Sequence, residues 1–171
     1  MMPSCVVGAL VEMMRLSVEI RPYAVADLPA LCSLFYQTAH AVNARDYSPE
    51  QLQVWAPELP DLRRWNASLL AHRSYVAVYE GCLVGFGDIS PEGYLDRLYV
   101  HKDYQGRGVG SALCDVLESC VSAGCLTVHA SLTARGFFER RGYELVCERE
   151  LVLRGVSLRN FLMRRCREGK G

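Results

Sequence analysis

The sequence predicts an α/β (α+β) domain in which helices flank a mixed, mostly antiparallel sheet of six to seven strands. Three observations support this fold class. Segments that alternate apolar and polar residues lie on both sides of a block with helical periodicity. Several of these segments are separated by short turns, which indicates antiparallel hairpins. Near the middle of the chain a strand, a helix and a strand follow one another, which predicts one parallel, right-handed crossover.

The N-terminal part predicts one strand and three helices. Residues 16–21 alternate in polarity, and Pro22 ends this strand. Asp27 is a suitable N-cap for the first helix, whose apolar residues recur up to residue 38. Ser48 and Gln51 have the spacing of a capping box, which starts a second helix. The third helical pattern covers residues 61–72.

From residue 75 onward the period changes to that of strands. Glu80-Gly81 and Arg154-Gly155 are turn signals, so each predicts a hairpin between the segments that it joins. The expected helices of this part span residues 108–123 and 133–141. The expected strands span residues 75–79, 82–89, 94–100, 126–131, 143–153 and 156–164.

Length and charge limit the classes of protein that fit. A chain of 171 residues, half of them hydrophobic, is enough for one domain with a real core, which we place at residues 15–167. The 19 basic and 19 acidic residues cancel, so we expect no nucleic-acid partner. Residues 1–14 are apolar but lack a basic start and are too short to span a bilayer. We expect them to be a disordered or misannotated leader and expect no membrane partner.

The cysteine pattern indicates the redox compartment. None of the eight cysteines forms a Cys-x-x-Cys pair, and no Cys/His cluster has the spacing of a zinc site. Several lie in apolar runs, where a thiol behaves as a small hydrophobic side chain. We therefore expect reduced thiols, a cytoplasmic protein and no metal.

A Gly-rich turn carries most of the chemical information. After the strand at 94–100 the chain reads Gln-Gly-Arg-Gly-Val-Gly over residues 105–110, and a helix follows. Glycines let a ligand approach the backbone, and the first amides of a helix are free to bind an anion. Arg107 adds a positive charge, so a pyrophosphate suits this turn. No lysine follows Gly110, which excludes a P-loop, and a purely structural turn remains an alternative on glycine spacing alone.

The residues around this turn resemble a known family. Residues 98–113 look like motif A of the GNAT superfamily, the Gcn5-related N-acetyltransferases, with Gln105, Gly108 and Gly110 matching its Q/R-x-x-G-x-G/A core. Residues 134–143 resemble motif B, which ends in Gly-Phe or Gly-Tyr. The resemblance spans residues 16–165, and segments such as 46–51 are most similar to the YafP-like branch of bacterial members.

The resemblance implies a GNAT fold and an N-acetyltransferase that uses acetyl-CoA as acyl donor, without a metal. A primary amine on a small molecule or peptide would attack the thioester directly. Relatives are commonly monomers or homodimers, so either state is expected here. The residues that would hold the cofactor are Leu98, Tyr99, Val100, Gln105, Gly106, Arg107, Gly108, Val109, Gly110, Ser111 and Phe138.

The catalytic residues are less defined by the resemblance. Asp96 lies two residues before Leu98, and we place both on one face of the strand; Asp96 is the candidate base. A salt bridge with Arg97 or Arg141 is the alternative for Asp96. The family's motif-B tyrosine, the usual acid, falls on Phe138, so Ser131 is the candidate acid, with Tyr99, Thr133 or no residue as alternatives.

Acceptor recognition in the family comes from the first helices. Tyr47 and Trp55 lie in this region, and their aromatic side chains are candidates for the acceptor pocket, although core packing is the alternative. A second function remains open, a non-catalytic acyl-CoA-binding module that acts as a sensor or partner. A toxin-type enzyme acting on charged tRNA is disfavoured by the neutral net charge.

Overall fold

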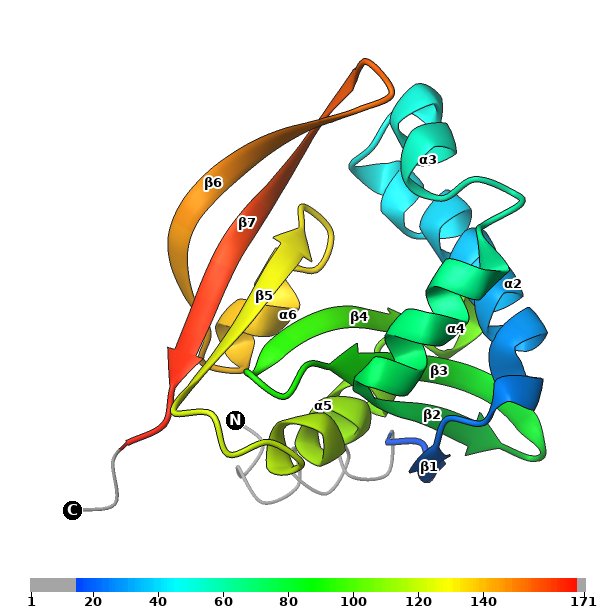
Figure 1. Cartoon of the computed structure of the whole chain (residues 1–171), viewed down its shortest axis with the longest axis vertical. Coiled ribbons are helices and arrows are strands. Elements are labelled where there is room, and N and C mark those ends of the chain that lie inside the picture. The colour runs from blue at the N-terminus through cyan, green and yellow to red at the C-terminus, as the bar shows by residue number, and fades with distance from the viewer. Residues whose placement is uncertain (1–14, 169–171) are drawn as a thin grey trace, which may run out of the picture.

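The computed structural model describes residues 15–168, and the expected leader over residues 1–14 lies outside them. In the described part, seven strands form one sheet in the order β1-β2-β3-β4-β5-β7-β6 (Figure 1). The neighbours β4 and β5 run parallel, and the other five neighbouring pairs are antiparallel. The predicted fold class and its single parallel crossover are therefore confirmed.

The elements follow the expected order with small changes at their ends. The strands are β1 (Glu19–Pro22), β2 (Arg73–Tyr79), β3 (Cys82–Ile89), β4 (Tyr94–Val100), β5 (Cys125–Ser131), β6 (Glu144–Leu153) and β7 (Val156–Cys166). The α-helices are α2 (Leu28–Ala41), α3 (Pro49–Trp55), α4 (Leu62–Ala71), α5 (Val109–Ser119) and α6 (Arg135–Arg140). Three 3-10 turns are η1 (Val25–Asp27), η2 (Asn43–Arg45) and η3 (Lys102–Tyr104). Among the described residues, no helix is long and apolar enough to cross a membrane.

The two predicted helix caps have different outcomes. The capping box of α3 is confirmed, because Ser48 Oγ accepts from the Gln51 amide at 3.2 Å and Gln51 Oε1 accepts from the Ser48 amide at 2.8 Å. The side-chain cap expected from Asp27 is wrong. Its carboxylate instead accepts two hydrogen bonds from Arg21, both at 2.8 Å, and one from the Ala24 amide. The arginine of the neighbouring strand is a stronger partner than a helix amide.

Helices cover both faces of the sheet. On one face, α2 packs against Val76, Phe86 and other side chains of β2, β3 and β4. On the other face, α5 packs its apolar stripe on β2 and β3. Gly85 and Gly87 of β3 lie under α5, where an added Cβ at Gly87 would be 2.8 Å from Leu117 Cδ1. The close approach of α5 to the sheet therefore depends on these glycines.

The β4 and β5 strands separate soon after they meet, as Figure 1 shows. Only two parallel pairs join them in the described structure, Tyr94 with Thr127 and Leu95 with Val128. On its other side β4 pairs with β3 throughout, apart from a register shift at which Asp96 has no partner residue. This shift is a β-bulge. The C-terminal half of β4 thus has one edge that no strand of the described part covers.

One pair of cysteines corrects the expectation of reduced thiols. Cys125 and Cys166 are partners in the β5–β7 ladder and form a disulfide in this structure. The two residues are separated by 41 positions in the sequence, so their proximity follows from strand register and not from a sequence motif. Five other cysteines of the described part are free: Cys32, Cys82, Cys114, Cys120 and Cys147.

Substituting Gly87 tests the packing of α5 on the sheet. We expect Gly87→Ala to lower the free energy of unfolding by about 1–3 kcal/mol, because its Cβ would meet Leu117 and, at 2.9 Å, the Arg97 carbonyl oxygen. Urea denaturation followed by circular dichroism measures this change. The matched control is Gly124→Ala, whose Cβ has no atom within 4 Å and should change stability by less than about 0.5 kcal/mol. Equal stability of the two variants would contradict the packing argument.

The disulfide gives a second stability prediction. Reduction should lower the free energy of unfolding by about 2–4 kcal/mol, because the link between Cys125 and Cys166 restricts the unfolded chain. Denaturation with and without a thiol reductant measures the difference. The double variant Cys125→Ser/Cys166→Ser should be insensitive to the reductant. Wild type that is equally insensitive, with both thiols free by mass spectrometry of alkylated protein, would show that the bond does not form.

Candidate active site

The Gly-rich turn connects η3 to α5, and a row of its backbone amides has no partner among the described residues. Gly106 and Gly108 have φ values of +69° and +83°, which other residues rarely adopt. Within residues 15–168, no backbone N–H from Gln105 to Ser111 has a hydrogen-bond acceptor, and the first one that does is Ala112, which donates to Gly108 at 3.0 Å. These amides and the start of α5 form a positive cradle that suits a pyrophosphate.

Neighbouring segments fix the position of the turn. The Gln105 side chain donates to the Val100 carbonyl at 2.6 Å, and the Leu16 amide donates to the Arg107 carbonyl at 2.9 Å. An added Cβ at Gly106 would meet no atom within 4 Å, so this part of the turn is open. The Arg107 side chain is exposed above Tyr104 and is free to reach a bound anion.

The uncovered edge of β4 presents backbone groups beside the turn. Val100 is opposite Gly85, and the hydrogen bond runs from the His101 amide to the Val84 carbonyl. Val100 and Gly85 are therefore a non-hydrogen-bonded pair, so the N–H of Val100 points away from β3, toward the gap before β5. By the same alternation, Leu98 also directs its backbone to the gap, whereas Tyr99 directs its backbone to β3. The Val100 carbonyl accepts from the side chains of Thr38 and Gln105, at 3.3 and 2.6 Å.

Phe138, which was predicted to hold the cofactor, and its neighbour Phe137 lie in different surroundings. Phe138 is 2% exposed and packs edge-on against Tyr143 in the core. Its neighbour Phe137 is partly exposed, and its ring lies 3.5 Å from where a Gly110 Cβ would be. Successive residues of a helix point about 100° apart, so Phe138 is directed to the core and Phe137 to Gly110. We move the prediction from Phe138 to Phe137.

Asp96 lies on a different face from the one expected. Leu98 packs toward α5, but Asp96 lines a cavity on the side of α2 and α4, next to Arg97. The bulge explains this, because an extra residue in a strand interrupts the alternation of side chains. Arg97 Nη1 lies 3.4 Å from Asp96 Oδ2, so the predicted salt bridge with Arg97 exists, whereas Arg141 pairs with Glu118 and Asp115.

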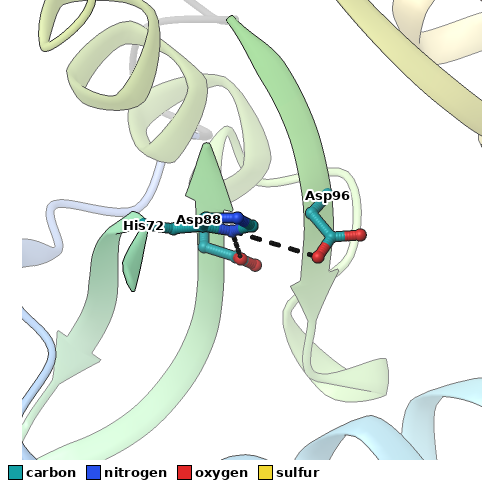
Figure 2. Close-up of side chains that lie close together, drawn as sticks. All are labelled: His72, Asp88 and Asp96. Carbon is teal, nitrogen blue, oxygen red and sulfur yellow. Dashed lines mark hydrogen bonds and ion pairs between the residues drawn. The ribbon is translucent and has the colours of Figure 1, made fainter. Parts of the chain in front are cut away.

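Asp96 belongs to a cluster of charged side chains from three segments (Figure 2). His72, at the end of α4, places Nδ1 2.6 Å from Asp88 Oδ2 and 4.0 Å from Asp96 Oδ2. Asp88 is completely buried on β3 and also accepts from Arg97 Nη1 at 2.8 Å. The ligand-type atoms of His72, Asp88 and Asp96 lie within 4.8 Å of one another, but the Arg97 guanidinium already supplies a cation there.

Burial and charge perturb the acidities in this cluster. Removal from water raises the pKa of Asp96 above its ordinary value, and the Arg97 guanidinium only partly opposes this. The hydrogen bond to Asp88 raises the pKa of His72, against the effect of its burial. Asp96 is therefore a better proton acceptor than a surface aspartate.

The cavity beside Asp96 brings two of the predicted residues together. It has a volume of about 450 Å³, and Trp55 and Asp96 both line it, together with Phe35 and Trp65. The Phe35 ring lies 6.1 Å from Trp55 and 5.0 Å from Trp65, so one wall is aromatic. An aromatic wall with a carboxylate suits an amine that arrives as a cation.

Tyr47, the other candidate for the acceptor pocket, has structural contacts. It is buried, its hydroxyl donates to the Arg159 carbonyl at 2.8 Å, and it accepts from the Leu132 amide at 3.0 Å. These bonds join the segment before α3 to β7 and to the end of β5. The described contacts of Tyr47 thus hold the wall that carries Trp55, whose ring lies 5.4 Å away. A direct role in acceptor binding stays a prediction.

The candidate acids lie in different surroundings. Ser131 ends β5, and its Oγ accepts from the Ala134 amide at 3.0 Å. Thr133 donates to Asp46 at 2.7 Å on the surface. Tyr99 packs among aromatic side chains of α2 and β3, and burial strongly raises the pKa of its hydroxyl. Ser131 keeps its hydroxyl proton available, so it stays a prediction as the acid.

Sequence reasoning missed His72 and Asp88. They lie on separate elements and belong to no motif, and their proximity depends on the pairing of β2 with β3. One signal was present, a single carboxylate at Asp88 inside the otherwise apolar run of residues 82–89. A buried carboxylate requires partners, so such a residue indicates a polar cluster.

Known proteins are similar to this chain in sequence and in fold. A family model described as an acetyltransferase (GNAT) domain matches residues 43–164. YafP of Escherichia coli (strain K12), described as an uncharacterized N-acetyltransferase, is 38% identical over 149 residues, which are 86% of this chain and 95% of YafP.

Two solved structures extend the comparison. A GCN5-related N-acetyltransferase, also titled aminotransferase class-II, from Rhodopseudomonas palustris has a TM-score of 0.85 and 34% identity, covering 89% of this chain and 97% of its own. The PaiA N-acetyltransferase of Thermoplasma acidophilum, solved with coenzyme A, shares the fold with a TM-score of 0.70 at 18% identity, covering 89% and 100%. With the family model and these relatives, the chain belongs to the GNAT family of acetyltransferases.

Proposed function

We propose that this acetyltransferase transfers the acetyl group of acetyl-CoA to a primary amine by direct attack. One observation carries the proposal: the unpaired amides from Gln105 to Ser111 adjoin the uncovered edge of β4. Unpaired backbone groups next to a helix N-terminus suit a ligand with a pyrophosphate and an amide-containing arm. The coenzyme A complex of the Thermoplasma acidophilum neighbour supports the same ligand.

The donor is held by backbone rather than by side-chain charge. The amides of the turn bind the pyrophosphate, with Arg107 as a mobile positive partner. The outward-facing groups of Leu98 and Val100 pair with the pantetheine arm, as an added strand would. The Val100 N–H is placed to donate to the thioester carbonyl oxygen, where negative charge develops during attack. Phe137 covers the arm from the side of α6.

The acceptor enters through the cavity that Trp55 and Asp96 line. It arrives as an ammonium, and Asp96 accepts one proton, directly or through a water, to give the neutral amine. The amine nitrogen then forms a bond to the carbonyl carbon, and the bond from that carbon to sulfur breaks. The thiolate leaves and takes a proton from Ser131, and the proton that the new amide loses restores this hydroxyl through solvent. Small-molecule and peptide amines both fit a cavity that is open to solvent.

An Asp96→Asn variant tests this role of the carboxylate. We expect kcat for amine acetylation to fall about 100-fold or more, because Asn cannot accept the proton. The affinity for acetyl-CoA should stay unchanged, since Asp96 lies outside the Gly-rich turn. Release of free thiol gives the rate, and mass spectrometry of the acceptor shows whether one acetyl group was added.

The control for this variant removes a carboxylate elsewhere. Glu144 is exposed on β6, away from the cavity, so Glu144→Gln should acetylate as wild type does. Full activity of Asp96→Asn would contradict the assignment of the base. Thiol release without any acetylated amine, over a broad set of primary amines, would contradict the proposed reaction.

A further inference from the structure

A fully buried carboxylate lies behind the proposed base and has no role in the reaction as described so far. Asp88 is 0% exposed on β3, and its Oδ2 accepts from both His72 and Arg97. Its Oδ1 has no hydrogen-bond partner within residues 15–168. Burial of a charge is costly unless it is paired, so this carboxylate requires the two cations beside it.

His72 connects this buried carboxylate to the cavity wall. It follows α4 directly, and its side chain turns toward β3 and β4, as Figure 2 shows. Both groups near Nδ1 are carboxylates, Asp88 at 2.6 Å and Asp96 at 4.0 Å, so Nδ1 carries a proton. The short bond to Asp88 fixes the ring, whose side chain is 19% exposed.

We propose that His72 is a positioning residue for Asp96: clamped by Asp88, its imidazolium holds the Asp96 carboxylate ionised at the wall of the acceptor cavity. This inference rests on the proposed function of Asp96 as the base. The bulge makes the arrangement possible, because it turns Asp96 to the same face of the sheet as Arg97 and His72. Arg97 holds the carboxylate from one side and His72 from another.

The charges that face these two groups set the direction of the effect. Around Asp96, burial and the Asp88 charge raise the pKa, whereas Arg97, His72 and His129 lower it. Around His72, Asp88 and Asp96 raise the pKa, whereas burial and Arg97 lower it, and the net direction is upward. The pKa of Glu92 is lowered chiefly by a hydrogen bond with Ser90, and the His72 charge makes a smaller contribution in the same direction. Loss of the imidazolium therefore raises the pKa of Asp96 further, and the base is protonated over a wider range of acidic pH.

His129 provides a matched control on the opposite side of Asp96. It lies on β5 and bonds through Nδ1 to the Tyr94 hydroxyl at 3.0 Å, with no carboxylate partner within ion-pair distance in the described part. Burial and Arg149 lower the pKa of His129 below its ordinary value, and the Asp96 charge opposes them only in part. Asp88 and Asp96 therefore favour the protonated ring at His72, whereas burial and Arg149 disfavour it at His129.

The pH dependence of kcat/KM for amine acetylation tests the inference. We compare wild type with His72→Gln, which keeps an N–H donor for Asp88 but removes the charge, and with His129→Gln. We expect the acidic limb of the profile to move to higher pH in His72→Gln and activity to return toward wild type at high pH. The profile of His129→Gln should move less than that of His72→Gln, because the His129 charge has the smallest effect on the pKa of Asp96. Acetyl-CoA affinity and circular dichroism report that each variant is folded.

Two further variants separate the possible outcomes. His72→Lys keeps a cation, so its acidic limb should lie nearer to wild type than that of His72→Gln; a purely structural role would lower both variants equally at every pH. An unmoved limb in His72→Gln, with Asp96→Asn still impaired, would overturn the role of His72 and leave the proposed function intact. Full activity of Asp96→Asn, together with an unchanged acidic limb in His72→Gln, would overturn both the role of His72 and the proposed role of Asp96 as the base.

Discussion

The early separation of β4 from β5 is the constraint on which the rest of the site depends. Two parallel pairs, at Tyr94 and Leu95, join the strands, and beyond them the edge of β4 has no partner strand within residues 15–168. Backbone polar groups need hydrogen-bond partners, so an uncovered edge inside a sheet calls for another extended group. The Gly-rich turn follows the same strand after η3, and its amides from Gln105 to Ser111 have no acceptor within residues 15–168. One interruption of the sheet thus creates both halves of a site for a long ligand that contains phosphate.

The bulge in β4 adds the acceptor side to this site. In a regular strand Asp96 and Arg97 would face opposite sides of the sheet. The unpaired position of Asp96 places both on the side of α2 and α4, where the aromatic cavity lies. The carboxylate, the buried Asp88 and His72 then form one charged cluster beside an apolar wall. The bulge therefore determines the charge arrangement beside the cavity, because it brings Asp96 to the same face as Arg97 and His72.

Local signals in the sequence predicted local structure well. The order of elements along the chain, the hairpins and the capping box at Ser48 and Gln51 depend on residues near one another in the chain, and all are confirmed. In the Gly-rich turn, Gly106 and Gly108 adopt the positive φ values that glycine allows. Predictions of the face of a strand or helix on which a side chain lies were less accurate. Asp96 shares a face with Arg97 because of a bulge, and Phe137, not Phe138, lies beside Gly110 because one residue along α6 changes the face.

Contacts between distant segments could not be read from the chain. The Asp27 carboxylate forms an ion pair with Arg21 of β1. Cys125 lies opposite Cys166 because of the register of β5 and β7, and His72 contacts Asp88 because β2 pairs with β3. Each of these depends on where a sheet places two strands, and neither periodicity nor a motif contains that information. The buried Asp88 left a compositional trace in β3, but the identity of its partners required the fold.

Titration calorimetry with acetyl-CoA tests the central claim most directly, with wild type compared to Gly110→Glu and Gly124→Glu. Gly110 lies in the first turn of α5, where a glutamate favours the helix but places a negative charge at the amide cradle. Gly124 is open to solvent outside the turn, so the same change there is a matched control. We predict that wild type and Gly124→Glu bind acetyl-CoA equally and that Gly110→Glu, although folded, does not. Equal binding by Gly110→Glu, or no binding by folded wild type, would contradict the account.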